Sequence, residues 1–176
     1  MTSRVVFWTG PSHKERAGTA PDGDARYAKK HGKSYYGYKA HIRTDGDNQL
    51  ICRAKITPAN VDDSRVFSEL ITSPTRAVYA DKIYDSQKNK DWLADHGIAN
   101  GILKKANRNL KLTAEQQQRN ARRGLKRRLI ERVFAHFKHG QPYRHVRYLG
   151  LVKKQLELTL KAVTYNLRRL VTLAAA

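Results

Sequence analysis

The chain has 176 residues, and its 35 lysines and arginines against 15 acids give a formal net charge of +20. This length suits one domain with its own hydrophobic core, and the charge predicts an anionic polymer as the partner. The single cysteine, Cys52, excludes a disulfide framework and fits a reducing, cytoplasmic compartment. No apolar run reaches the roughly 18 residues that a membrane span needs. Nucleic acid is therefore the expected partner, and a membrane is not.

Strand and helix patterns alternate along the first part of the chain. The expected elements are a strand over 5–8, a loop over 10–34, strands over 35–43 and 50–57, a helix over about 62–71, a strand over 77–81, a helix over about 86–96 and a strand over 98–104. The strands are aromatic or apolar runs bounded by turn residues. This order predicts a mixed α/β domain with helices over a central sheet.

The last part of the chain is basic and helical, since residues 104–169 contain 19 lysines and arginines against three acids. Thr113 and Gln116 fit a capping box that opens a helix running through Glu131. The apolar side of that helix gathers Leu125, Leu129, Ile130, Val133, Phe134 and Phe137. A final helix over 149–170 has an apolar stripe at i+3/i+4 spacing, which we interpret as its core side. The stripe consists of Leu149, Val152, Leu156, Leu160, Val163, Leu167 and Leu170.

Two carboxylates stand out by their positions. Asp81 ends a short apolar strand, where open α/β sheets place their sites, and Glu131 is the one acid on a helix face shared with Arg127, Arg128 and Lys138. Carboxylates on separate rigid elements can hold Mg²⁺, and two such ions would clamp the attacking and leaving oxygens of a phosphodiester. A structural interpretation competes with this one. Asp81 would cap the strand end or pair with the lysine after it, and Glu131 would pair with Arg127 and Arg128.

Five short segments of the chain form a further pattern. They are Gly32–His41 (GKSYYGYKAH), Thr57–Ser64 (TPANVDDS), Tyr79–Tyr84 (YADKIY), Arg127-x3-Glu131-x6-Lys138 and Arg144–Gly150 (RHVRYLG). Together they resemble the central segments of bacterial insertion-sequence DDE transposases, and the fourth is similar to the Y-R-E-K signature of that family. The resemblance covers about residues 20–170.

The resemblance implies a ribonuclease H-like mixed sheet flanked by helices, with a basic C-terminal helical region. It implies a DDE site for Mg²⁺ or Mn²⁺, in which Asp81 and Glu131 are the second and third catalytic and metal-binding acids. The implied activity is DNA transposition, by metal-dependent cleavage and strand transfer of double-stranded DNA at transposon ends and target. The resemblance also implies that the protein lies in the bacterial cytoplasm and is associated with the nucleoid. It further implies that the protein binds DNA as a homodimer.

Five cations are candidates for DNA contact. Arg127 and Lys138 follow from the resemblance, and Arg123 and Arg128 lie on the same basic helix. Lys39 lies in a strand where lysines and tyrosines are interleaved, a pattern that can track a DNA backbone with help from stacking. A half-buried aromatic strand with solvated lysines explains that strand equally well.

The family pattern is incomplete in this chain. Gly124 stands where the signature has its tyrosine, and residues 1–12, where the first catalytic aspartate belongs, contain no acid. Arg4 falls about where that aspartate would lie. Asp22 and Asp24 are the nearest acids, but they lie in the loop and are not expected to replace it.

We therefore interpret the chain as an N-terminally truncated member of the family, with its first strand missing or altered. Residues 1–20 are expected to be irregular, and residues 21–176 to form a partial catalytic domain. Two functions stay open: a catalytic-domain fragment of a transposase, and a catalytically inactive DNA-binding remnant. A basic RNA-binding protein shares the charge, but it does not explain where Asp81 and Glu131 lie.

Overall fold

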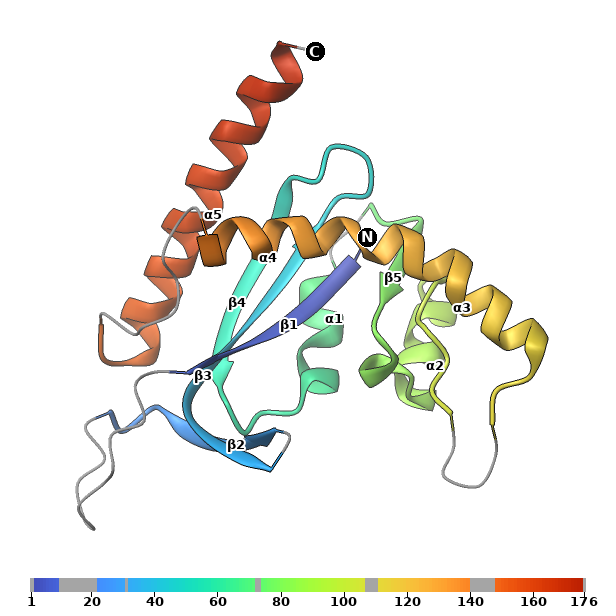
Figure 1. Cartoon of the computed structure of the whole chain (residues 1–176), viewed down its shortest axis with the longest axis horizontal. Helices are drawn as coiled ribbons and strands as arrows, with labels where there is room; N and C mark the ends of the chain where they lie inside the picture. Colours follow the sequence, from blue (N-terminus) through green and yellow to red (C-terminus); the bar gives the residue numbers. More distant parts are fainter. Residues whose placement is uncertain are drawn as a thin grey trace.

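In the computed structural model, the described residues are 2–9, 22–30, 32–71, 74–106, 111–139 and 148–175, and they form an α/β domain (Figure 1). The elements, in chain order, are the strands and helices β1 (Thr2–Thr9), β2 (Arg26–Lys30), β3 (Lys33–Thr44), β4 (Ile51–Pro58), the 3₁₀ helix η1 (Asp63–Val66), α1 (Phe67–Leu70), β5 (Ala77–Ala80), the 3₁₀ helix η2 (Lys82–Tyr84), α2 (Gln87–Asp95), β6 (Ala99–Asn100), α3 (Ala114–Arg127), α4 (Leu129–His139) and α5 (Leu151–Ala174). Among these residues, none of the helices combines the length and apolarity that crossing a membrane requires.

The sheet is built around β3, which pairs antiparallel with β1, β2 and β4. β1 and β4 each pair with the same stretch of β3, from about Tyr38 to Thr44, so they lie on its opposite sides. β1 then pairs parallel with β5, and β5 pairs parallel with β6. The sheet is therefore antiparallel in its first half and parallel in its second, with β1 as the strand that joins the two halves.

The position of β1 corrects one expectation. Residues 2–9 lie in the segment expected to be irregular, but they form a strand that pairs with a neighbour on each side. The first strand is therefore present, and it is altered, as the other half of that expectation had it, because it contains no acid. A second strand, β2, lies within the stretch that the sequence predicts as a loop. The expected helix over 62–71 is also divided, into η1 and α1.

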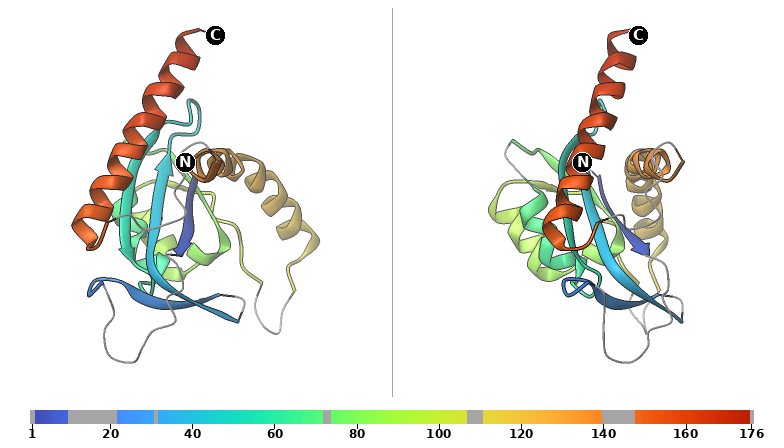
Figure 2. Two further views of the ribbon diagram at one scale, coloured as in Figure 1. Left: turned by 60° about the vertical axis from the view of Figure 1, so that its left-hand side comes forward. Right: turned by 90° about the vertical axis from the view of Figure 1, so that its left-hand side faces the viewer.

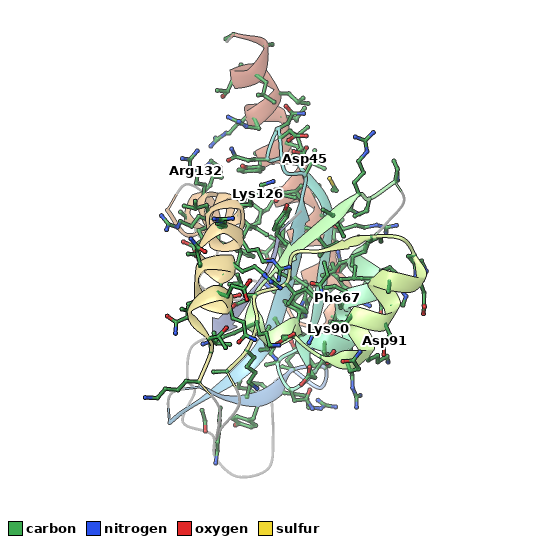
Figure 3. The ribbon with its side chains drawn as sticks, turned by 90° about the vertical axis from the view of Figure 1, so that its right-hand side faces the viewer. Asp45, Phe67, Lys90, Asp91, Lys126 and Arg132 are labelled. Atoms are coloured by element: carbon green, nitrogen blue, oxygen red, sulfur yellow. The ribbon has the colours of Figure 1, made fainter. Side chains whose placement is uncertain are left out.

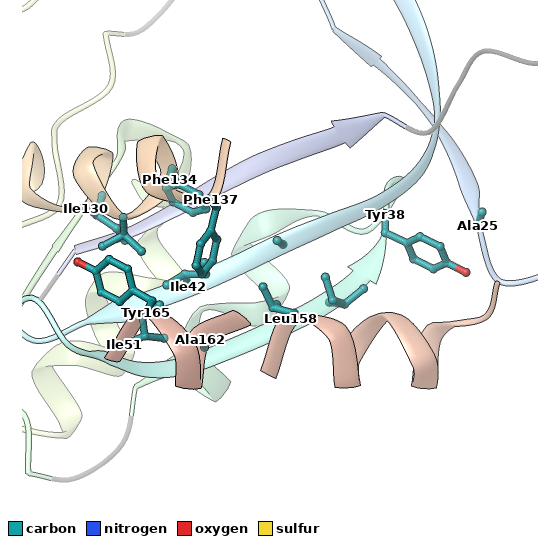
Figure 4. Packing of buried hydrophobic residues seen from close by; sticks show 13 residues of the cluster. Ala25, Tyr38, Ile42, Ile51, Ile130, Phe134, Phe137, Leu158, Ala162 and Tyr165 are labelled. Atoms are coloured by element: carbon teal, nitrogen blue, oxygen red, sulfur yellow. The ribbon is translucent and has the colours of Figure 1, made fainter. Parts of the chain in front are cut away.

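Helices cover both faces of the sheet, with α1 and α2 on one face and α3 and α4 on the other (Figure 2). Alternation along β3 explains how its two faces differ. Tyr38, Ala40 and Ile42 join the larger hydrophobic core with residues of α4 and α5 (Figure 4). The intervening Lys39, His41 and Arg43 are also buried, but they point to the α1 side, where they form polar contacts.

The helix that contains Glu131 follows its sequence pattern closely. The capping box at Thr113 and Gln116 is formed, and a single turn residue, Arg128, separates α3 from α4. The apolar side of α4 is buried as expected, through Ile130, Val133, Phe134 and Phe137. Leu125 of α3 differs, because it is 59% exposed.

The final helix corrects a second expectation. Its leucine stripe does not pack on the core, since Leu156, Leu160 and Leu167 are each more than half exposed. α5 instead packs on β4 through the opposite side, where Leu158 and Tyr165 are buried.

Side-chain amides also join this side of α5 to the sheet. Gln155 accepts from the backbone N–H of Ile56 at 2.8 Å and donates to Ala54 at 3.0 Å. Asn166 makes the same two-way contact with Ile51, at 2.8 and 2.9 Å. β4 pairs with β3 on one side, so these amides satisfy backbone groups on its other side.

Candidate functional site

The end of β5 and the junction of α3 and α4 bring the two predicted acids together. Asp81 follows β5 directly and caps η2, with its Oδ1 accepting from the backbone N–H of Lys82 at 2.7 Å. Glu131 lies in the first turn of α4. Both side chains are 39% exposed, so each carboxylate remains open to solvent and ligands.

Arg127 links the two carboxylates. Its Nη2 lies 3.3 Å from Oε1 of Glu131, one helical turn further on, and its Nη1 lies 3.8 Å from Oδ2 of Asp81. The Arg127 side chain is 19% exposed, and its buried Nε has no hydrogen-bond partner among the described residues. The guanidinium is therefore shared between the acids by two contacts, of which the one to Asp81 is long. The structural interpretation of each acid also holds, because Asp81 caps a helix and Glu131 pairs at i−4.

Two further contacts hold α3 against the parallel half of the sheet. Arg123 donates from both terminal nitrogens to the carbonyls of Ile102 and Asn100, each at 2.7 Å. Burial lowers the pKa of Arg123, with the charge of a neighbouring arginine acting in the same direction. Lys126 donates to the hydroxyl of Tyr79 at 3.2 Å, and its Nζ lies 5.0 Å from the centre of that ring. These anchors position Arg127, the next residue, over the end of β5.

The register of β1 places Arg4 at this site. Thr2 pairs with Tyr79 and Ser3 with Ala80 in the parallel ladder between β1 and β5, so the next position along each strand is Arg4 beside Asp81. This is the position to which the resemblance assigns the first catalytic aspartate. β1 contains no acid at any of its positions.

Asp22 and Asp24 do not replace that acid, as expected, because they hold the start of α5. Asp22 accepts from the backbone N–H of Gly150 at 3.0 Å and from the hydroxyl of Tyr38 at 2.8 Å. Asp24 accepts from the N–H of Leu151 at 2.9 Å. Burial opposes the ionisation of Asp22, but these hydrogen bonds outweigh it and lower the pKa of its carboxyl. Both acids satisfy N–H groups that a helix start leaves without partners.

The candidate DNA contacts occupy different environments. Lys39 is buried, and its Nζ donates to the carbonyl of Val61 at 2.8 Å and to Asp63 at 3.1 Å. This placement does not suit a phosphate contact, because the ammonium is enclosed and ion-paired. Arg123 is likewise occupied by backbone carbonyls. The side chain of Lys138 lies outside the described residues.

Exposed cations lie along α3 and α4, and two of them, Lys126 and Arg132, are labelled in Figure 3. The set comprises Arg119, Arg122, Lys126, Arg128 and Arg132. Their spacing places them on consecutive turns of the two helices, beside the acids rather than among them. Sequence reasoning had singled out only Arg128 of this set, although exposure on a basic helix is the signal that unites all five.

Comparison with known proteins decides the family. A family profile described as the transposase DDE domain matches residues 6–167. This chain belongs to that family. The transposase for insertion sequence element IS1106 of Neisseria meningitidis serogroup B is 37% identical over 148 residues, which are 83% of this chain and 51% of that protein. The chain thus spans about half the length of the curated relative that it matches.

A transposase DDE domain implies dependence on a divalent metal ion, and the chemistry of the two acids fits such an ion. Asp81 and Glu131 supply carboxylate oxygens from two rigid elements, and one or two carboxylates are what a Mg²⁺ site commonly uses. Within the described part of the chain, no group of three or more His, Cys, Asp or Glu side chains is arranged to hold an ion. Arg127 lies between the two carboxylates, so an ion that bridged them would compete with its guanidinium.

Proposed function

We propose that this chain provides part of the active site for DNA transposition, with Asp81 and Glu131 as the second and third acids of a DDE site. The observation that carries the proposal is that both acids contact Arg127. One acid follows a strand and the other lies on a helix far away in sequence, so the fold brings them together. Family membership supports the same reaction class, namely cleavage and strand transfer of DNA phosphodiesters.

The fold that we propose is ribonuclease H-like. Three antiparallel strands (β1, β3 and β4) are followed by two strands, β5 and β6, that extend the sheet in parallel beside β1. Helices lie on both faces (Figure 2). In this arrangement β1 and β5 are neighbours, so an acid on each of them, together with one from a helix across the sheet end, would converge.

The proposed roles follow from charge and position. Asp81 and Glu131 would hold Mg²⁺, which would supply activation of the attacking oxygen and stabilisation of the leaving oxygen. When no metal ion is bound, the Arg127 guanidinium partly neutralises the two carboxylates. The exposed arginines of α3 and α4, such as Arg122, Arg128 and Arg132, would hold the phosphate backbone of double-stranded DNA.

A second candidate function is DNA binding without catalysis. β1 carries Arg4 where a third acid would complete the site, and Arg127 already neutralises part of the charge of the remaining two. A site with two acids and two nearby arginine positions holds metal less strongly than one with three acids. We infer that this chain by itself binds DNA and has weak or no strand-transfer activity.

Strand transfer by the purified chain, with labelled transposon-end DNA and Mg²⁺ or Mn²⁺, separates the two functions. If the chain is catalytic, Asp81→Ala and Glu131→Ala each abolish product, whereas Asp95→Asn and Glu115→Gln leave it unchanged. The controls are exposed acids of α2 and α3 that lie away from the site. DNA binding with no product from any variant would select the second function. Product that survives both alanine changes would refute the site itself.

A further inference from the structure

The outward side of α5 is an apolar surface on a highly charged protein. Leu156, Leu160, Val163, Leu167 and Leu170, which we call the α5 stripe, are each between 48% and 59% exposed. The last buried residue of α5 is Tyr165, so its final turns extend past the sheet (Figure 1). This surface is separate from the acidic site and plays no part in the proposed chemistry.

The spacing of the α5 stripe is that of a helix-to-helix seam. Its residues follow one another by steps of four, three, four and three, which is the seven-residue repeat of a coiled coil. Lys153 and Ala174 continue the repeat at its two ends. The opposite side of the helix carries Leu158 and Tyr165 against β4, so α5 can pack on its own sheet and on a second helix at once.

The area of the surface suits a stable pair of proteins. Val152 and Val171 border the stripe and are 82% and 71% exposed, and Leu149 just before the helix is 58% exposed. At roughly 100 Å² for each such side chain, the eight residues offer on the order of 800 Å², the area that each partner of a standard interface buries. Monomeric proteins rarely expose an apolar patch larger than a few hundred Å².

We propose that the α5 stripe pairs with the same stripe of a second copy of this chain, with the two helices antiparallel. A two-fold axis between Leu160 and Val163 brings each of these residues opposite the other on the partner helix, and it brings Leu156 opposite Leu167. Lys153 then faces Leu170 near a helix end, where its ammonium reaches solvent. Parallel pairing would instead place each Lys153 against its own copy within the seam.

Charge gives the proposed pair a salt dependence opposite to that of DNA binding. Three cations (Lys153, Lys161 and Arg168) and one acid (Glu157) line a groove of about 620 Å³ along one flank of α5, and each chain carries a net charge of +20. Two copies therefore repel one another electrostatically while their leucines attract. Added salt screens the repulsion, so self-association is expected to strengthen with salt, whereas binding to DNA weakens.

Sedimentation of the full chain over a range of concentrations tests the partner. We expect a monomer–dimer equilibrium that tightens between about 0.1 and 0.5 M salt. Leu160→Glu should raise the dimer dissociation constant at least tenfold. Leu125→Glu, on α3, is the matched control because its leucine is 59% exposed against 58% for Leu160, and it should change the constant less than twofold. A monomer at every concentration, equal effects of the two variants, or a dimer that weakens with salt would overturn the proposal.

Disulfide trapping tests the direction of the two helices. The exposed native thiol is first removed by Cys52→Ser. In that background, the double change Leu160→Cys and Val163→Cys should give a cross-linked dimer. Leu167→Cys alone should not, because an antiparallel pair separates the two copies of residue 167 by about 16 Å along the axis, too far for a disulfide. Efficient cross-linking through Leu167→Cys would show that the helices are parallel and would refute this arrangement.

Discussion

Replacing Arg127 by glutamine is expected to strengthen binding of a divalent cation at Asp81 and Glu131. An ion can enter in two ways: the guanidinium moves away, or it stays and repels the ion. Moving away breaks two partly solvated ion pairs of 3.3 and 3.8 Å, at about 0.5 kcal/mol each. Staying costs about 2 kcal/mol, since a divalent ion and a guanidinium about 4 Å apart repel even in water.

The cheaper route sets the size of the effect. Arg127 would leave at a cost of about 1 kcal/mol, so Arg127→Gln should lower the dissociation constant for Mn²⁺ about fivefold. The buried Nε of Arg127, which has no hydrogen-bond partner among the described residues, adds no contact that would hold the side chain in place.

A Mn²⁺ titration followed by electron paramagnetic resonance measures this change directly. Arg128→Gln serves as the control, because it removes the same charge from the adjacent, exposed position. If the two variants bind Mn²⁺ equally well, the gain comes from net charge alone. Weaker binding by Arg127→Gln than by the unchanged chain would show that Arg127 supports the metal site instead of competing for it.

Three further changes probe the surroundings of the site. Lys39→Met leaves Asp63 buried without this cation, so the free energy of unfolding in urea should fall by about 3–5 kcal/mol, while the slope of DNA affinity against salt stays the same. Asp22→Asn should cost about 1–2 kcal/mol at pH 7. Burial opposes ionisation of Asp22, but hydrogen bonds, chiefly from Gly150, lower its pKa. This contribution is therefore present above about pH 4, and it is lost as the pH falls through the lowered pKa, so the unfolding free energies of variant and parent should converge in acid. Burial and two nearby lysines lower the pKa of His41 to about 3. The unfolded chain therefore binds a proton that the folded chain does not, and stability should fall by up to about 1.4 kcal/mol per unit as the pH drops below about 6.5, a slope that His41→Asn removes.

Local patterns in the sequence predicted most of the fold. The capping box, the apolar side of α4 and the strand that ends at Asp81 depend on neighbours in sequence, and the structure has all three. Pairing partners depend on residues far apart, and β1 shows the consequence. Val5 and Phe7 indicate a strand, but its eight-residue ladder with β3 and its parallel pairing with β5 are visible only in three dimensions.

The two wrong expectations about side chains share a physical cause. Periodicity shows which side of α5 is apolar, but it does not show which side faces the sheet. The side that faces the sheet carries Leu158 and Tyr165, together with Gln155 and Asn166, which form hydrogen bonds to backbone groups about a hundred residues away in sequence. Lys39 was likewise interpreted from its own strand, whereas its burial comes from Asp63, in the 3₁₀ helix that follows β4.

The site shows the same division between local and distant information. The spacing of Arg127 and Glu131 predicts their ion pair, and the structure has it. That Asp81 joins the same guanidinium follows from the packing of α3 on β5, which no local pattern encodes.

The contact between α5 and β4 also bears on synthesis of the protein. β4 emerges from the ribosome long before Gln155 and Asn166, so the nascent chain carries a strand whose outer backbone groups have no partner yet. Such an open edge can pair with a strand of another chain. Ribosomes that follow one another on a single message hold several such edges close together. Deletion of α5 should therefore yield insoluble protein, even though the acidic site lies elsewhere in the fold.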